Sequence, residues 1–147
     1  MEFALRRATW RISFILWFVL LFILSSLPGA PDPSLKIIFS DKIAHAAYFT
    51  VGSAAFLLAL SQQSRKNHSL AFLLFACISM AAAVGWFDEW HQTYTPHRDG
   101  NNLGDWLANL CGGFLGFYTG LCCHRYINSR RALPHGNDRV NSLSLPR

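Results

Sequence analysis

The stretch ISFILWFVLLFIL, residues 12–24, is apolar at every position except Ser13. It lies inside a longer apolar run, residues 8–27, and a helix of about 20 residues rises ~30 Å, enough to cross the hydrocarbon core of a bilayer. Three more apolar runs follow at residues 43–60, 70–87 and 106–123. The chain is 52% hydrophobic and 14% charged, whereas soluble domains are about 25% charged. These features predict an all-α protein, a bundle of four transmembrane helices.

The first run has an alternative interpretation as a secretory signal peptide, because Arg6, Arg7 and Arg11 precede its apolar core. A signal peptide ends in a small-x-small cleavage site. No such site follows here, and Pro31 comes directly after Ala30, the only small residue suited to cleavage. We therefore expect this run to remain as the first of four helices.

The basic residues are distributed unevenly around the four runs. The larger group holds ten of the 13 lysines and arginines: Arg6, Arg7, Arg11, Arg65, Lys66, Arg125, Arg130, Arg131, Arg139 and Arg147. The first and third loops hold only Lys36, Lys42 and Arg98. Basic loops stay in the cytoplasm, so we expect a multi-pass protein of the cell (inner) membrane with both termini cytoplasmic.

The same distribution divides the chain into three parts. Residues 1–7 form a short cytoplasmic N-terminus, residues 8–123 form the membrane domain, and residues 124–147 form a basic tail that contains Pro134 and Gly136 and is expected to be disordered. The net charge of +5 is then a topology signal and an attraction to anionic lipid. We expect no nucleic-acid partner.

Three polar clusters lie at the ends of the apolar runs, and the predicted topology places all three at the outer face. They are Asp41-x3-His45, Asp88-Glu89-x2-Gln92 and Asp105-x3-Asn109. Ionisable groups near a bilayer core are costly and are kept where they pair or act. Their common location predicts a functional site.

The individual residues allow ordinary as well as functional interpretations. Asp41 and Asp105 open helices, where the helix dipole favours an acid, and His45 lies one turn after Asp41, which could orient it for proton transfer. Asp88 and Glu89 instead end a helix, where the dipole disfavours negative charge.

Arg98 is the strong cation of the third loop, and it either pairs with these two acids or holds a phosphate. A metal site from His45, Asp88, Glu89 and His91 is an alternative. These residues follow no known ligand spacing, so we expect neither a metal nor another cofactor.

Gly112, Gly116 and Gly120 form two overlapping G-x-x-x-G steps in the fourth run. Such steps allow two helix backbones to approach closely. They predict tight packing of this helix, either within the chain or between copies. A homo-oligomer that forms through these three glycines is therefore one of the two alternatives.

Three segments resemble the VanZ-like membrane proteins, a family named after a teicoplanin-resistance accessory protein. The segments are SDKIAHAAYFTVG (residues 40–52), WFDEWHQTYTPHR (86–98) and GDWLANLCGGFLG (104–116), and the resemblance covers residues 36–120. The positions that match the family pattern are Asp41, Lys42, His45, Asp88, Glu89, Gln92, Arg98, Asp105 and Asn109. The resemblance implies a polytopic cell-membrane protein that influences susceptibility to glycopeptide antibiotics, and it implies no particular reaction.

Two functions follow as hypotheses. The first is an enzyme that acts on a membrane lipid or a lipid-linked envelope intermediate, with Asp88 or Glu89 as general acid or base, His45 as proton shuttle and Arg98 as phosphate clamp. In it, Gln92, Asp105 and Asn109 position the substrate. The second is a non-catalytic accessory protein that binds lipid, antibiotic or a partner protein through the same residues. A proton-coupled transporter is less favoured, because no charged residue lies near the middle of a run.

Overall fold

The computed structural model describes residues 2–29, 40–60 and 68–132, and four helices account for most of them. The helices are α1 (Glu2–Ser26), α2 (Ser40–Ala59), α4 (Leu70–Gln92) and α5 (Leu103–Ala132). Each is long and apolar enough to cross a membrane. The prediction of an all-α fold is confirmed for the described residues, with four helices that are long and apolar enough to span a membrane.

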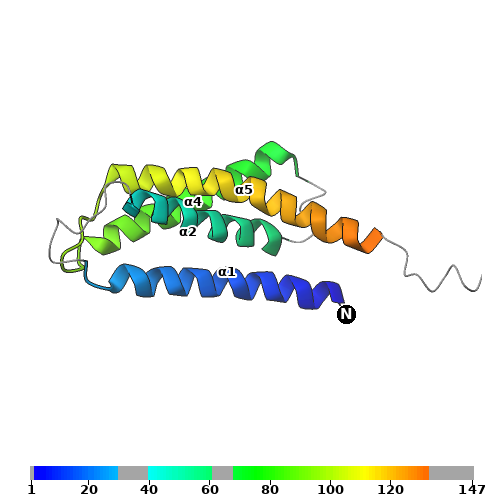
Figure 1. Ribbon diagram of the computed structural model, residues 1–147, viewed down its shortest axis with the longest axis horizontal. Coiled ribbons are helices and arrows are strands. Elements are labelled where there is room, and N and C mark those ends of the chain that lie inside the picture. The colour runs from blue at the N-terminus through cyan, green and yellow to red at the C-terminus, as the bar shows by residue number, and fades with distance from the viewer. Residues whose placement is uncertain (1, 30–39, 61–67, 133–147) are drawn as a thin grey trace, which may run out of the picture.

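The helices lie side by side in an elongated bundle (Figure 1). The N-terminus and the end of α5 lie at one end, and the loop that joins α4 to α5 lies at the other. This second end, where α1 and α4 finish and α2 and α5 begin, is called the loop end below. The basic residues Lys36, Arg65, Lys66, Arg139 and Arg147 lie outside the described residues.

Two helices are longer than the apolar runs predict. α4 continues past residue 87 to Gln92, because its polar last turns are buried inside the bundle rather than exposed to water. α5 continues past residue 123 to Ala132, into the segment expected to be a disordered tail. Residues 124–132 contain no proline or glycine, and Tyr126 accepts a hydrogen bond from Arg130 one turn later. Residues 133–147 lie outside the described residues.

The glycine steps of α5 pack against α2 of the same chain. A Cβ atom at Gly112 would lie 2.5 Å from the carbonyl oxygen of Ala46, and one at Gly116 would lie 2.5 Å from that of Thr50. Gly120 faces α2 in the same way. The glycines are therefore buried against α2 of the same chain. A homo-oligomer contact through them stays a prediction.

α1 is joined to α2 by a reciprocal pair of hydrogen bonds. The indole nitrogen of Trp17 donates to the carbonyl oxygen of Tyr48 at 3.0 Å, and the hydroxyl of Tyr48 donates to the carbonyl oxygen of Trp17 at 2.9 Å. The Trp17 ring covers Gly52, where a Cβ atom would overlap it. This contact fixes α1 beside the rest of the bundle.

The outside of the bundle is covered by large apolar side chains. Leu16 on α1 is 62% exposed and Phe75 on α4 is 69% exposed, and many similar residues surround them. Contiguous apolar surface of this kind is rare on soluble monomers and is expected where lipid contacts the helices. The fold is that of a multi-pass membrane protein.

Candidate functional site

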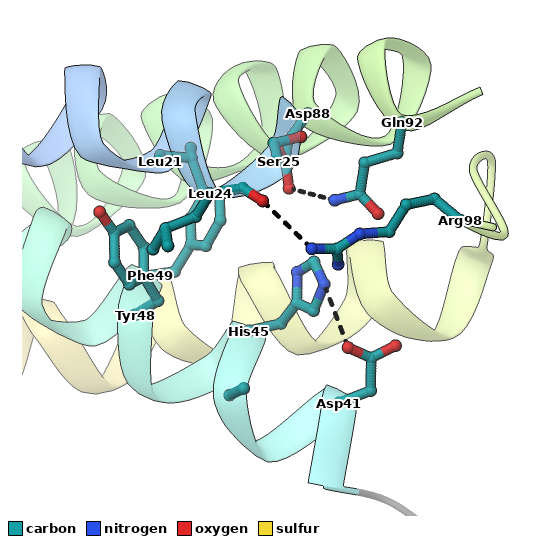
Figure 2. A pocket seen from close by; sticks show the side chains of 11 residues that line it. Leu21, Leu24, Ser25, Asp41, His45, Tyr48, Phe49, Asp88, Gln92 and Arg98 are labelled. Carbon is teal, nitrogen blue, oxygen red and sulfur yellow. Dashed lines mark hydrogen bonds and ion pairs between the residues drawn. The ribbon is translucent and has the colours of Figure 1, made fainter. Parts of the chain in front are cut away.

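Most of the buried polar side chains gather at the loop end of the bundle. The deepest of them, each at most 6% exposed, are Ser25, Asp88, Glu89, Gln92, Asp105 and Asn109. His45 reaches them from α2, and its side chain is 10% exposed. The structure thus brings together helix ends that lie far apart in the sequence (Figure 2).

His45 is held by Asn109 from the neighbouring helix. Its Nδ1 lies 3.0 Å from the amide oxygen of Asn109, a contact in which the ring nitrogen donates and the amide oxygen accepts. Asn109 has room because residue 85 is glycine, where a Cβ atom would lie 2.8 Å from the Asn109 amide nitrogen. Asp41 was expected to orient the ring. Its Oδ1 is 3.9 Å from Nε2 and its side chain is 52% exposed, too far for a hydrogen bond.

Asp88 is buried beside Gln92 on the last turns of α4. The Gln92 amide donates to Oδ2 of Asp88 at 3.0 Å, which matches their spacing of one helical turn. Both side chains line a cavity. The hydrogen bond partly compensates for the removal of the carboxylate from water.

Glu89 is also buried, although it lies about 100° around the helix from Asp88. The loop before α5 folds over it. The backbone N–H of Asn102 donates to Oε2 of Glu89 at 2.9 Å, and the N–H of Asn101 donates to the Glu89 carbonyl at 3.2 Å. Gly100 permits this approach, because a Cβ atom there would meet the same carbonyl. Glu89 therefore has partners from the loop that follows α4.

Asp105 forms an ion pair with Lys42. The Lys42 Nζ lies 2.9 Å from Oδ1 of Asp105, and the side chains are 39% and 5% exposed, respectively. Gly104 leaves space for the lysine, since a Cβ atom there would lie 2.8 Å from Lys42 Cε. Asp105 also lies in the first turn of α5, where the helix dipole favours it. The contact joins the starts of α2 and α5.

Arg98 binds the end of α1 rather than an acid. Its Nε donates to the carbonyl oxygen of Leu27 at 3.2 Å, and its Nη2 donates to that of Leu24 at 3.1 Å. These carbonyls lie in the last turn of α1 and just beyond it, and that of Leu24 also accepts from the Leu27 N–H at 3.3 Å. The guanidinium therefore caps the C-terminal end of α1. In the described part of the chain it forms no ion pair with Asp88 or Glu89, in contrast to one of the two roles expected for it.

A cavity of about 140 Å³ lies between α1, α2 and α4. Figure 2 shows apolar side chains toward one side of it and polar side chains toward the other. The polar lining includes Ser25, Asp41, His45, Asp88, Gln92 and Arg98, and the apolar lining includes Leu21, Leu24, Ala44 and Phe49. Since water occupies about 30 Å³ per molecule in the liquid, the cavity has room for a few waters or a small polar group.

The sequence interpretation missed three polar residues at this end. Asn102 caps α5, with its Oδ1 accepting from the Gly104 N–H at 2.9 Å. An Asn just before an apolar helix is a known N-cap signal and could have been recognised. Ser25 lines the cavity, and the hydroxyl of Thr95 donates to the Ser25 carbonyl at 3.1 Å. Nothing in the first apolar run distinguishes Ser25.

Two groups of side chains lie close enough to share a metal ion. One oxygen of Asp88, one oxygen of Glu89 and one ring nitrogen of His45 lie within 4.8 Å of one another. The same is true of His45, Asp41 and Asp105. In the second group Asp105 is paired with Lys42 and Asp41 is half exposed, so the first group is better suited to a cation.

Comparison of the chain with protein-family models, with curated proteins and with solved structures found no significant match.

Proposed function

We propose that the protein is a VanZ-like enzyme of the cell envelope that acts on the headgroup of a membrane lipid or lipid-linked intermediate. The observation that carries the proposal is the cavity whose lining joins His45 and Asp88 to Leu21 and Phe49. A lipid is amphiphilic, and a cavity with one polar and one apolar side fits the junction between headgroup and chain.

The polar residues are suited to proton transfer. A ring nitrogen of His45 lies within 4.8 Å of a carboxylate oxygen of Asp88, and both residues line the cavity. A base and an acid held within reach of one bound group form the usual arrangement for general acid–base catalysis. Asp88 is the better placed of the two acids, because Glu89 is not among the residues that line the cavity.

The location of the site follows from the charge distribution. With the basic termini in the cytoplasm, the loop end lies at the outer leaflet of the cell (inner) membrane. Enzymes there meet lipid-linked precursors of the wall after these have crossed the bilayer. An effect on glycopeptide susceptibility, which the family resemblance suggests, would be a consequence of such a change in the envelope.

A second function, a non-catalytic accessory protein, is favoured by a different observation. Lys42 of α2 binds Asp105 of α5, and Trp106 of α5 binds the Ala82 carbonyl of α4. Arg98, in the loop between α4 and α5, binds the end of α1, so that hydrogen bonds link all four helices. A network of this kind can serve only to hold the bundle together, at about 0.6–2 kcal/mol per contact.

The two functions differ in their response to Asp88→Asn and Glu89→Gln, which keep side-chain shape and remove a carboxylate. Total envelope lipids are compared by mass spectrometry in cells that lack the protein, carry it, or carry a variant at equal abundance. Asp99→Asn, in the exposed loop, is the matched control. A lipid that changes with the intact protein and the control, and not with Asp88→Asn, supports catalysis. Identical profiles in all strains would favour the accessory protein.

A further inference from the structure

We infer that His45, Asp88 and Glu89 bind a divalent transition-metal ion, Zn²⁺ or Mn²⁺, at the inner edge of the cavity. One donor atom of each residue lies within 4.8 Å of the others, and all three side chains are largely buried. The inference concerns the same end of the bundle as the proposed function and does not depend on it, since a metal can be bound whether or not a lipid is converted.

Hydrogen bonds from neighbouring residues hold each of the three side chains, and Asp88 has a second one, from the Ser25 hydroxyl. Asn109 binds Nδ1 of His45 at 3.0 Å, Gln92 binds Oδ2 of Asp88 at 3.0 Å, and the N–H of Asn102 binds Oε2 of Glu89 at 2.9 Å. The Oε1 atom of Glu89 takes part in none of these bonds. Metal-binding histidines and carboxylates are typically oriented in this way by outer partners.

Glu89 supplies the independent observation. The residue is 3% exposed, and its Oε1 is buried without a hydrogen-bond partner among the described residues. A buried carboxylate oxygen that lacks a partner is costly. A cation bound to Oε1 would remove that cost, and the loop that covers Glu89 provides no side-chain donor to it in the described part of the chain.

The positive side chains nearby are bonded to groups other than Asp88 and Glu89. Lys42 is bonded to Asp105, and two nitrogens of Arg98 are bonded to the end of α1. Asp88 and Glu89 therefore form no ion pair with a lysine or arginine within the described residues. A divalent ion would balance both carboxylates.

The donor set points to the kind of metal. Mg²⁺ and Ca²⁺ prefer sites made only of oxygen, whereas one imidazole with two carboxylates suits Zn²⁺ and other first-row ions. Three protein ligands leave at least one coordination position open. Because His45 and Asp88 line the cavity, the open position would face it and take water or an anionic oxygen such as that of a phosphate.

The test measures metal binding to the purified full chain in detergent. The protein is stripped with chelator, loaded with Zn²⁺ or Mn²⁺, separated from free ion and analysed for metal per chain. We expect one ion per chain for the wild type, and at least about a tenfold weaker affinity for Glu89→Gln and His45→Gln. The exposed loop variants Asp99→Asn and His97→Asn should bind as the wild type does. Less than about one ion in ten chains of wild type, or equal binding by Glu89→Gln, would overturn the inference.

A second measurement excludes binding to the exposed cysteines Cys111, Cys122 and Cys123. The X-ray absorption spectrum of the zinc-loaded wild type should show nitrogen and oxygen neighbours at about 2.0–2.2 Å, and sulfur neighbours at about 2.3 Å would contradict the site. This spectrum identifies the metal ligands from the wild type alone, so it tests the site even where a variant fails to fold. If the protein binds metal but changes no lipid, this inference stands and the proposed function is wrong. If the protein changes a lipid but binds no metal, the proposed function stands and this inference is wrong.

Discussion

The Nδ1 atom of His45 lies 3.0 Å from the amide oxygen of Asn109, and this contact joins α2 to α5 at the centre of the polar end of the bundle. Asn109 is fully buried, and its amide nitrogen has no partner among the described residues. The contact sets the ring orientation on which both the proton-transfer and the metal-binding proposals rest.

The first prediction concerns this contact. Asn109→Ala removes the partner of a buried imidazole and leaves a cavity, so it should destabilise the protein by about 1–3 kcal/mol. Thermal unfolding in detergent measures the change. Asn128→Ala, on the exposed part of the same helix, should have less than about 0.5 kcal/mol of effect. Equal stability of the two variants would show that Asn109 does not hold His45.

Gly116 tests the close approach of α2 and α5. Gly116→Val places side-chain atoms where a Cβ atom alone would be 2.5 Å from the Thr50 carbonyl oxygen, so the helices must separate, at a cost of about 1–3 kcal/mol or more. The exposed neighbour Leu115→Val is the control. Loss of stability with an unchanged oligomeric state is expected in size-exclusion chromatography with light scattering. A change from oligomer to monomer without loss of stability would instead place these glycines between copies.

The Lys42–Asp105 pair leads to a prediction about coupling. Lys42→Met leaves the Asp105 carboxylate buried without its partner, and because Lys42 is 39% exposed, we expect about 1–3 kcal/mol of destabilisation rather than the larger cost of a fully buried pair. Asp105→Asn in the same chain removes the charge and should restore most of the loss. Additive effects in this double-mutant cycle would mean that the two side chains do not interact.

Arg98 leads to a prediction about the end of α1. Arg98→Lys keeps the charge, but a lysine cannot reproduce the two-nitrogen contact with the carbonyls of Leu24 and Leu27. The last turn of α1 should then open more often, and hydrogen exchange near residues 25–27 should become faster. His97→Asn, next to it in the loop, serves as control. Unchanged exchange would indicate that Arg98 does not cap α1.

Much of the fold could be predicted from the sequence because each apolar run is an independent signal. A run such as residues 12–24 needs no partner to identify it as a membrane helix. The meeting of Asp41, Asp88 and Asp105 at one end also follows from helix order alone, since alternate helices run in opposite directions. The helix ends were less predictable. α4 extends through Asp88 and Gln92 only because other helices bury those residues.

The contacts within the site depend on distant parts of the chain and could not be derived from spacing. Arg98 finds helix carbonyls from α1, and Asn102 reaches Glu89 across a loop. The metal-binding group joins His45 of α2 to two acids of α4, so no ligand spacing within one helix reveals it. Asn109 replaces Asp41 as the partner of His45 for the same reason.

Turnover by the purified protein tests the central claim most directly. Wild type, Asp88→Asn and Asp99→Asn are reconstituted into vesicles made from total envelope lipids, with Zn²⁺ or Mn²⁺ present, and the lipids are followed by mass spectrometry over time. The account predicts that one lipid species is consumed by wild type and by Asp99→Asn, and at least about a hundredfold more slowly by Asp88→Asn, as expected for the loss of a general acid or base. Equal consumption by all three proteins, or none by the wild type, would contradict an enzyme built on His45 and Asp88.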